Sequence, residues 1–305
     1  MLDLEGLHLR AALFRSIRDF FVGQDFLEVD TPVRQPVMIP ESYIEPIRAG
    51  SWFLQTSPEQ CMKRLMGRGA KRIFQLSPCF RKGESGRKHL EEFMMLEWYR
   101  QDADYTQLMD DCRSLLCHVM ADLLKQKRFA AIIKRSCLQE MELQQQWPRM
   151  SVEDAFLAFC PTTAGEALSK NLFDEMMVEH IEPQLGRILP LFLYDYPVQC
   201  SSLARRKESD PHVVERFEMY VNGLELANGF SELTDIEEQR SRFNQEIMRI
   251  KEMSGRDAQM PRRFLEDLQL IERAAGIALG FDRLLMLLMS KESINEVVSF
   301  SPADW

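Results

Sequence analysis

One segment in the first third of the chain combines basic, aromatic and acidic side chains at spacings that suit a nucleotide. A polar loop begins at Arg81 and carries further basic residues, namely Lys82, Arg87, Lys88 and His89. The residues that follow alternate, so that Phe93, Glu97 and Tyr99 share one face of a strand. A guanidinium binds a phosphate through a forked pair of donors, and an aromatic ring stacks on a base. The segment predicts a nucleotide site; a solvated loop over core aromatics is the alternative interpretation.

Carboxylates recur at regular intervals in a second segment. Glu218, Glu225 and Glu232 are seven residues apart, and Asn228 and Phe230 lie between the last two. Carboxylates beside triphosphate oxygens usually hold Mg²⁺. A carboxylate can equally bind an amino group, and an exposed acidic hairpin is the alternative for any one of these residues. The pattern therefore indicates either a metal site or an ammonium site.

Two glycines and an arginine mark a third segment near the C-terminus. Gly276 and Gly280 flank an apolar stretch, and Arg283 stands at the start of an apolar helix. Glycines in a strand allow another backbone or a ligand to approach closely. An arginine at this helix start can reach a phosphate. Alone, this spacing is a weak signal.

The elements that must position these residues follow from hydrophobic periodicity and turn signals. The sequence predicts strands at 26–30, 52–56, 72–80, 92–99, 192–196, 216–221, 224–228 and 276–280. It predicts helices ending at Gly23, beginning at an N-cap Ser57, and covering 104–127, 151–160, 173–184 and 282–289, with one more from about 234. Asn222-Gly223 is the preferred two-residue hairpin turn. This order predicts an α+β fold with a mainly antiparallel sheet flanked by helices.

Composition limits the class of protein. The 305 residues carry a net charge of −9, and 45% of them are hydrophobic. A dedicated nucleic-acid binder usually has a basic surface, which this balance disfavours. No unbroken apolar stretch is long enough for a membrane span, and the first residues are acidic where a signal peptide is basic. We therefore expect a cytoplasmic protein without a membrane partner.

Together the three segments resemble the catalytic core of the class II aminoacyl-tRNA synthetases. Residues 9–32 resemble motif 1, residues 80–99 motif 2 and residues 276–288 motif 3. Stretches at 56–59, 196–198, 203–205 and 225–235 resemble the lysine branch of the family. The resemblance implies that residues 1–305 form a single catalytic domain without an anticodon-binding domain. It also implies a homodimer formed through motif 1, to which Phe20 and Phe21 could contribute.

The resemblance implies ATP as a cofactor with Mg²⁺. The residues expected to contact ATP are Arg81, Lys82, Gly83, Glu84, His89, Phe93, Glu225, Leu226, Gly280 and Arg283. Of these, Arg81 and Arg283 are the expected catalytic residues: Arg81 for the α-phosphate and the substrate carboxylate, and Arg283 with His89 for the outer phosphates. Phe93 is expected to stack on adenine. The expected metal ligands are Glu218 and Glu225.

The resemblance also implies a pocket for a lysine-type amino acid. The expected substrate-binding residues are Ser57, Pro58, Glu59, Glu97, Tyr99, Asn228, Phe230, Glu232 and Ala278. Glu232 and Tyr99 are expected to bind the side-chain ammonium group. No side chain needs to act as a nucleophile, because the substrate carboxylate attacks phosphorus directly.

A synthetase core without an anticodon-binding domain resembles one branch in particular, the ligases that attach (R)-β-lysine to a lysine side chain of elongation factor P. Ala278 stands where lysyl-tRNA synthetases typically have glycine, and the added methyl group fits a β-amino acid. The expected partners are elongation factor P and lysine or β-lysine, with no stable tRNA binding. An enzyme for α-lysine or another acceptor is an alternative, and so is a non-catalytic paralogue that binds an amino acid.

Two departures from motif 2 concern adenine and ATP. The usual acidic residue follows the arginine by two positions, whereas Glu84 follows Arg81 by three. An asparagine that contacts ATP in the ligases is replaced by Leu90. Glu84 is therefore one position away from the acidic residue that contacts the adenine amine in the family.

Overall fold

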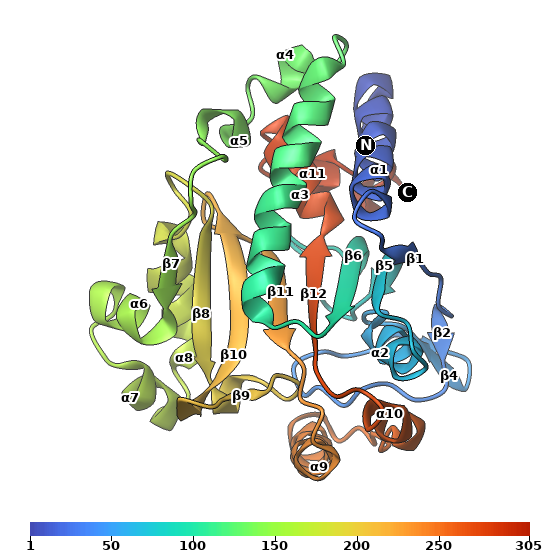
Figure 1. Cartoon of the computed structure of the whole chain (residues 1–305), viewed down its shortest axis with the longest axis vertical. Helices are drawn as coiled ribbons and strands as arrows, with labels where there is room; N and C mark the ends of the chain where they lie inside the picture. The colour runs from blue at the N-terminus through green and yellow to red at the C-terminus, as the bar shows by residue number, and fades with distance from the viewer.

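A large mixed sheet forms the centre of the molecule (Figure 1). The computed structural model describes the backbone of residues 1–305 and every side chain except that of Glu140. The strands in sheet order are β1 (Leu27–Glu28), β5 (Arg72–Phe80), β6 (Glu92–Gln101), β12 (Ala274–Gly280), β11 (Leu224–Ser231), β10 (Asp210–Val221), β8 (Leu191–Pro197) and β7 (Arg149–Ser151), and β9 (Arg206–Lys207) pairs with β10. Only the outer pairs β1–β5 and β7–β8 are parallel. The predicted α+β class with a mainly antiparallel sheet is confirmed.

Two hairpins in this sheet supply most of the predicted site. β5 pairs with β6 in continuous register from Arg72–Arg100 to Phe80–Glu92. β10 pairs with β11 around Asn222 and Gly223, whose φ angles of 52° and 72° are both left-handed. This is the geometry of a two-residue turn that matches the twist of the strands. The predicted Asn-Gly hairpin is confirmed.

The two faces of the sheet are covered by different helices. α1 (Leu4–Val22), α3 (Tyr105–Lys125) and α11 (Phe281–Met289) pack on one face, where α3 crosses in front of the strands in Figure 1. α2 (Glu59–Gly67), α9 (Ile236–Ser254) and α10 (Arg262–Leu268) lie at the lower end and contribute to a separate hydrophobic cluster. Because side chains alternate along a strand, Trp98 packs into the first cluster and its neighbour Tyr99 into the other. Tyr99 and the predicted residues that alternate with it on β6, Phe93 and Glu97, are therefore on the α2–α9–α10 face.

The remaining elements are short. They are α4 (Ala130–Ile133), α5 (Cys137–Glu140), α6 (Val152–Phe159), α7 (Ala164–Ser169), α8 (Phe173–Met176), the π-helical turn Met177–Ile181, 3₁₀ turns at Glu182–Gln184, Val198–Cys200, Ile294–Glu296 and Pro302–Asp304, and a small sheet of β2 (Arg34–Gln35), β4 (Trp52–Leu54) and β3 (Arg48–Ala49). Among the described residues, no helix has the length and apolar character that a membrane span requires.

Several local predictions differ from the structure. The strands predicted at 26–30 and 52–56 are shorter, at Leu27–Glu28 and Trp52–Leu54. The helix α2 begins at Glu59, so Pro58, with φ at −78° and ψ at −3°, takes the N-cap position that was predicted for Ser57. Phe20 and Phe21 are buried in the core of the chain itself, against α3 and β6, so they are not available for a contact between subunits. The turn of α1 that carries them faces inward because the sheet lies on that side.

Candidate functional site

Strand register aligns the predicted residues in two rows across four strands. One row consists of Glu97 on β6, Ala278 on β12, Asn228 on β11 and Glu218 on β10. The next row consists of Tyr99, Gly276, Phe230 and Arg216. Directly opposed residues point to the same side of a sheet, and so do residues two apart along a strand. The three segments that are far apart in the sequence therefore form one continuous surface.

Acidic side chains gather at the end of this surface beside α2. Glu97 and Glu232 are almost fully buried, and the Tyr99 hydroxyl donates a hydrogen bond of 2.8 Å to Glu97 Oε2. Glu59, at the start of α2, faces the same space. Lys63, one turn further along α2, pairs with Glu59 and lies 2.5 Å from Glu232 Oε2. The structure thus brings together Glu59, Glu97, Tyr99 and Glu232, as expected, around a lysine that was not expected.

Burial and mutual repulsion change the acidity of this cluster. Burial, together with the nearby Glu59 carboxylate, raises the pKa of Glu97 to about 8. Burial raises the pKa of Glu232 to about 8 as well, although Lys63 acts in the opposite direction. Glu41, on the segment after β2, has a pKa raised to about 7 by burial and by Glu59. The pocket is therefore an acidic site that favours a cationic ligand, because bound positive charge stabilises the ionised carboxylates.

The raised pKa of Glu97 predicts a pH-dependent stability. An unfolded glutamate titrates near pH 4.5, whereas the folded carboxyl holds its proton up to about pH 8. Between these values the folded protein binds more protons, so the free energy of unfolding falls as pH rises, by up to about 1.4 kcal/mol per pH unit for this group. Urea denaturation between pH 5 and 9 measures this slope. In Glu97→Gln the free energy of unfolding is expected to fall less steeply with pH. An unchanged slope would show that Glu97 does not cause the pH dependence.

The nucleotide end of the surface contains Arg81 and Phe93. The Arg81 guanidinium lies over the Phe93 ring at 5.3 Å from its centre, and Arg81 Nε donates to the Thr56 carbonyl at 3.3 Å. Glu84 Oε1 is 3.7 Å from Arg81 Nη1, so this displaced carboxylate lies beside the arginine. Lys82 instead pairs with Glu45 on the facing segment, at 2.7 Å. The Phe93 ring, which can stack on a base, and the Arg81 guanidinium, which is a forked donor, are therefore adjacent.

Arg283 links motif 3 to the motif 2 loop. Its Nη1 donates to the Glu225 carbonyl at 2.7 Å and lies 3.3 Å from Glu225 Oε2. Its Nη2 is 2.5 Å from His89 Nε2, and its Nε donates to the Lys88 carbonyl at 3.3 Å. Burial and the charge of Arg283 lower the pKa of His89, so the imidazole is neutral at pH 7 and accepts this hydrogen bond. His89, Glu225 and Arg283 thus form one contact group.

Glu218 and Glu225 differ in what they can offer a metal ion. Glu218 Oε2 accepts hydrogen bonds from Tyr196 at 2.6 Å and Tyr220 at 2.7 Å, and its Oε1 accepts one from Arg216 at 2.7 Å. Asn228 Nδ2 also donates to Oε1, at 3.4 Å, so each carboxylate oxygen accepts two hydrogen bonds and Glu218 must release one donor to bind a cation. Glu225 is about one-third exposed and retains open lone pairs. In the part of the chain that the structure describes, no three metal-ligating side chains converge. Of the two expected ligands, Glu225 fits Mg²⁺ directly.

The other expected residues occupy less direct positions. Ser57 Oγ accepts a hydrogen bond from the Glu59 backbone N–H at 3.4 Å, and Pro58 is at the N-cap of α2. Leu226 packs into the core on the opposite face, so only its backbone is on the site side. Gly83 forms part of the motif 2 loop with a φ of 78°, and Gly280 is the residue before α11. Leu90 is buried in the same core as Leu226, which explains an apolar side chain at that position.

Sequence reasoning missed residues whose role depends on packing. Lys63, Glu41 and the Tyr196–Tyr220–Arg216 shell around Glu218 were not predicted as parts of the site. For Lys63 a signal was present, because Glu59 and Lys63 have the i, i+4 spacing of a helical ion pair. Its second partner, Glu232, lies far away in the sequence and required the fold.

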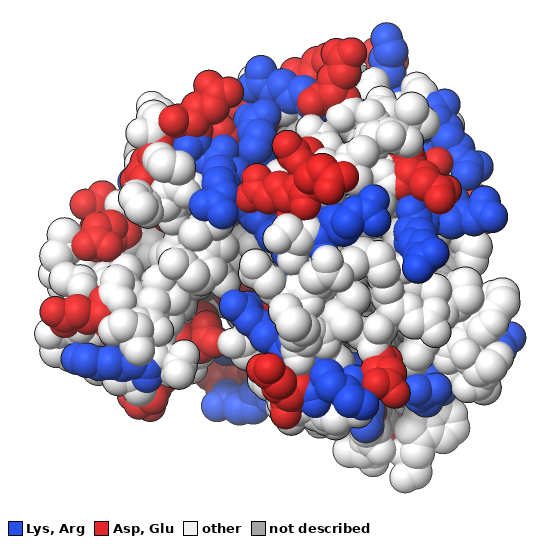
Figure 2. Space-filling model, turned by 90° about the horizontal axis from the view of Figure 1, so that it is seen from below, with Lys and Arg blue, Asp and Glu red and all other residues white. Residues whose placement is uncertain are grey.

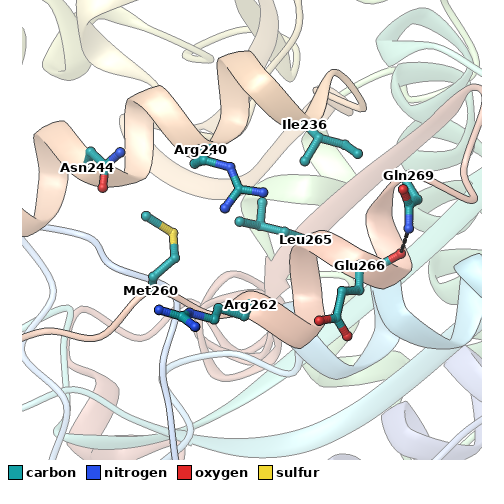
Figure 3. Close-up of a pocket in the computed structure, with 8 residues that line it drawn as sticks. All are labelled: Ile236, Arg240, Asn244, Met260, Arg262, Leu265, Glu266 and Gln269. Atoms are coloured by element: carbon teal, nitrogen blue, oxygen red, sulfur yellow. Dashed lines mark hydrogen bonds between the residues drawn. The ribbon is translucent and has the colours of Figure 1, made fainter.

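Two cavities lie outside this surface. One, of about 440 Å³, lies between α9 and α10 and is lined by Arg240, Met260, Arg262 and Leu265 among others (Figure 3). The other, of about 760 Å³, lies beside the small sheet and α10. Neither includes an expected site residue. The face seen in Figure 2 carries basic and acidic groups interspersed, rather than the broad basic surface of a nucleic-acid binder.

Comparison of the sequence with known proteins finds relatives of this chain. Residues 4–304 match the model of the class II tRNA synthetases for D, K and N. A protein of Pectobacterium carotovorum subsp. carotovorum (strain PC1) is 35% identical over 321 residues, which cover 98% of this chain and 95% of that protein. A protein of Vibrio cholerae serotype O1 is 35% identical, with the same coverage, and one of Hamiltonella defensa is 34% identical. All three are named elongation factor P–(R)-β-lysine ligase.

Proposed function

The chain belongs to the class II tRNA synthetase family of the D, K and N type, and from this premise we propose that it is an ATP-dependent ligase. It activates (R)-β-lysine, or lysine, as an aminoacyl-adenylate and transfers the acyl group to a lysine side chain of elongation factor P. The observation that supports this most is the acidic cluster of the buried Glu97 and Glu232 with the partly buried Glu59, on the same surface as Arg81 and Phe93. The names of the relatives support the acceptor.

The proposed first step needs positioning rather than a protein nucleophile. The acidic cluster holds the ammonium groups of the substrate, so that its carboxylate points toward Arg81. A carboxylate oxygen attacks the α-phosphorus of ATP, the bond to the β-phosphate oxygen breaks, and pyrophosphate leaves. Arg81 stabilises the charge that develops on the α-phosphate, and Arg283 with neutral His89 binds the outer phosphates. Phe93 stacks on adenine, and Glu84, which lies beside Arg81, is the carboxylate that we propose for its amino group.

Ligases of this class use ATP, generally with Mg²⁺. We propose Glu225 as the protein ligand of that ion, with Glu218 joining when one of its donors is displaced. The ion would neutralise charge on the phosphates. In the second step the amine of the acceptor lysine attacks the acyl carbon, and AMP leaves. A cytoplasmic location, a homodimer and a single catalytic domain over residues 1–305 stay predictions.

Pyrophosphate exchange tests the first step without any acceptor protein. Labelled pyrophosphate is incubated with ATP, Mg²⁺ and one amino acid at a time: (R)-β-lysine, (S)-β-lysine, L-lysine and L-norleucine. Exchange is expected with the diamino acids and is expected to be absent with norleucine, which lacks the terminal ammonium group. No exchange with any lysine isomer, together with measurable ATP binding, would instead support a non-catalytic amino-acid-binding protein.

Ala278 is expected to influence the choice between α- and β-lysine. It lies opposite both Glu97 and Asn228, so its methyl group projects from the floor of the pocket. One methyl group in a pocket typically changes discrimination about tenfold or more. Ala278→Gly is therefore expected to raise kcat/KM for L-lysine relative to (R)-β-lysine by about tenfold.

The neighbouring Ala275 provides the control for that substitution. It is on the same strand but packs into the core on the opposite face. Ala275→Gly introduces the same backbone flexibility. It is expected to leave the ratio of the kcat/KM values for the two substrates unchanged. If wild type and Ala278→Gly have the same ratio of kcat/KM for L-lysine to kcat/KM for (R)-β-lysine, Ala278 does not select the β-amino acid.

A further inference from the structure

Lys63 is a buried cation inside the acidic pocket. Its side chain is only 2% exposed. The Nζ atom pairs with Glu59 on its own helix and lies 2.5 Å from Glu232 Oε2, which follows β11. It also lies 5.0 Å from the centre of the Phe230 ring. One ammonium group thus connects two expected substrate-binding carboxylates that come from distant parts of the chain.

Lys63 remains charged in spite of its burial. Removal from water disfavours an ammonium ion and by itself lowers its pKa. The charges of Glu232 and Glu59 outweigh this effect, and the pKa of Lys63 is raised above its ordinary value. Lys63 is therefore a permanent positive charge at the base of the pocket.

Other charged groups face the same space from every element that packs against it. They are Glu59 on α2, Glu97 with the Tyr99 hydroxyl on β6, Glu232 after β11, Glu41 after β2, Glu246 on α9 and Arg81 after β5. Glu246 is engaged by Arg249 at 2.9 Å and by the Ser42 backbone N–H at 2.8 Å. In the proposed reaction Arg81 meets the substrate carboxylate. In the free protein the charge of Arg81 opposes the burial that raises the pKa of Glu41 and Glu97, whereas Lys63 is the cation that pairs directly with Glu59 and Glu232.

A charge count connects this cation with the substrate. Glu59, Glu97 and Glu232 carry three negative charges when all three are ionised, and Lys63 neutralises one, so two remain. A diamino acid carries two ammonium groups. Without Lys63 the same carboxylates repel one another and retain protons, and a protonated carboxyl does not attract an ammonium ion.

We propose that Lys63 is a positioning residue, which holds the carboxylates of Glu59 and Glu232 in place so that the pocket accepts a substrate with two ammonium groups. The proposal rests on the proposed function for the identity of that substrate. It adds a residue that acts through Glu59 and Glu232 rather than by touching the reacting atoms.

Lys63→Met tests this role because it keeps most of the side-chain length and removes the charge. Pyrophosphate exchange is measured between pH 6 and 10 with (R)-β-lysine, L-lysine and ATP as varied substrates. Loss of a cation raises the pKa of the nearby carboxyl groups, so they ionise at higher pH. The KM for the diamino acid at pH 7.5 is expected to rise at least tenfold, and the acid limb of kcat/KM to move up by about one pH unit. The KM for ATP is expected to stay within threefold.

Two further variants separate charge from packing. Lys63→Arg retains the charge and is expected to keep most of the wild-type affinity for the diamino acid. Lys63→Gln can form hydrogen bonds but is neutral, so it is expected to behave like Lys63→Met. Arg64→Met, at the next position of α2, removes an ion pair with Asp267 on the outer side and is expected to leave the pH profile unchanged. If Lys63→Met does not fold, the comparison of arginine with glutamine decides the question.

A titration of the free protein gives a readout that does not depend on catalysis. NMR spectra of protein with ¹³C-labelled glutamate carboxyl groups follow this titration. The signals of the buried carboxyl groups are expected to titrate at higher pH in the neutral variants than in wild type. Unchanged titration and unchanged KM in those variants would overturn the role of Lys63. Absence of exchange by the wild-type protein with every isomer would instead overturn the proposed function, and the carboxyl titration would still decide the role of Lys63.

Discussion

Arg81→Met is expected to lower the rate of pyrophosphate exchange by about 10³-fold or more. Loss of a single preorganised donor to a developing oxyanion typically costs about 10²–10³ in rate. Arg81 is in position to supply a forked, charged donor beside the Phe93 ring. Arg81→Lys keeps the charge but loses the fork, so it is expected to recover only a small part of the activity. Single-turnover formation of the adenylate measures the effect on the chemical step directly.

Arg87 provides the matched control for Arg81. It is in the same loop, is 72% exposed and pairs with Glu292 at the surface. Arg87→Met is expected to change the exchange rate less than threefold. An Arg81→Met protein that retained a tenth of the wild-type rate would exclude Arg81 as the main phosphate ligand.

Gly276→Ala is expected to destroy the amino-acid pocket while sparing most of the nucleotide site. A Cβ atom at this position would lie 2.1 Å from Tyr99 Cε1 and 2.6 Å from Glu232 Oε1. Tyr99 and Glu232 are both buried, so neither can move aside without disturbing the acidic cluster. We expect kcat/KM for the amino acid to fall at least 100-fold and the protein to lose about 1–3 kcal/mol of stability, as for other overpacked sites. Exchange kinetics and urea denaturation measure the two effects.

Gly165 provides the comparison for Gly276. It lies in α7 with open space around the position of a Cβ atom. Gly165→Ala is expected to leave activity unchanged and to stabilise the helix by up to about 1 kcal/mol. A Gly276→Ala protein with wild-type affinity for lysine would show that Tyr99 and Glu232 do not define the pocket in the proposed way.

The antiparallel hairpins could be predicted from sequence because their signals are local. The alternation of Phe93, Glu97 and Tyr99 placed them on one face, and the Asn222-Gly223 turn fixed the second hairpin. Gly276 was expected to allow a close approach, and the structure shows that the protein's own Tyr99 and Glu232 make it. The site as a surface was thus predictable from three motifs whose strands turn out to be neighbours.

Residues with tertiary partners could not be predicted in this way. The pairing of Lys63 with Glu232 depends on α2 packing against the end of β11, which no local pattern encodes. Of the donors around Glu218, Tyr196 comes from the neighbouring strand β8, whereas Arg216 and Tyr220 are on β10 itself, and together they change how readily that carboxylate can bind a metal ion. Capping of α2 was predicted at Ser57 because serine is preferred at an N-cap, but the helix begins one residue later, at Glu59, and Pro58 takes the position.

The central claim is the transfer of β-lysine to a protein, and the intact mass of elongation factor P tests it most directly. Purified elongation factor P is incubated with the enzyme, ATP, Mg²⁺ and each of (R)-β-lysine, (S)-β-lysine and L-lysine, and an incubation without ATP is the control. We expect the mass of elongation factor P to increase by one lysyl residue, with the largest modified fraction for (R)-β-lysine. We expect a single modified lysine side chain, which peptide mass spectrometry locates. An unmodified elongation factor P with every isomer, from an enzyme that exchanges pyrophosphate under the same conditions, would contradict the proposed acceptor.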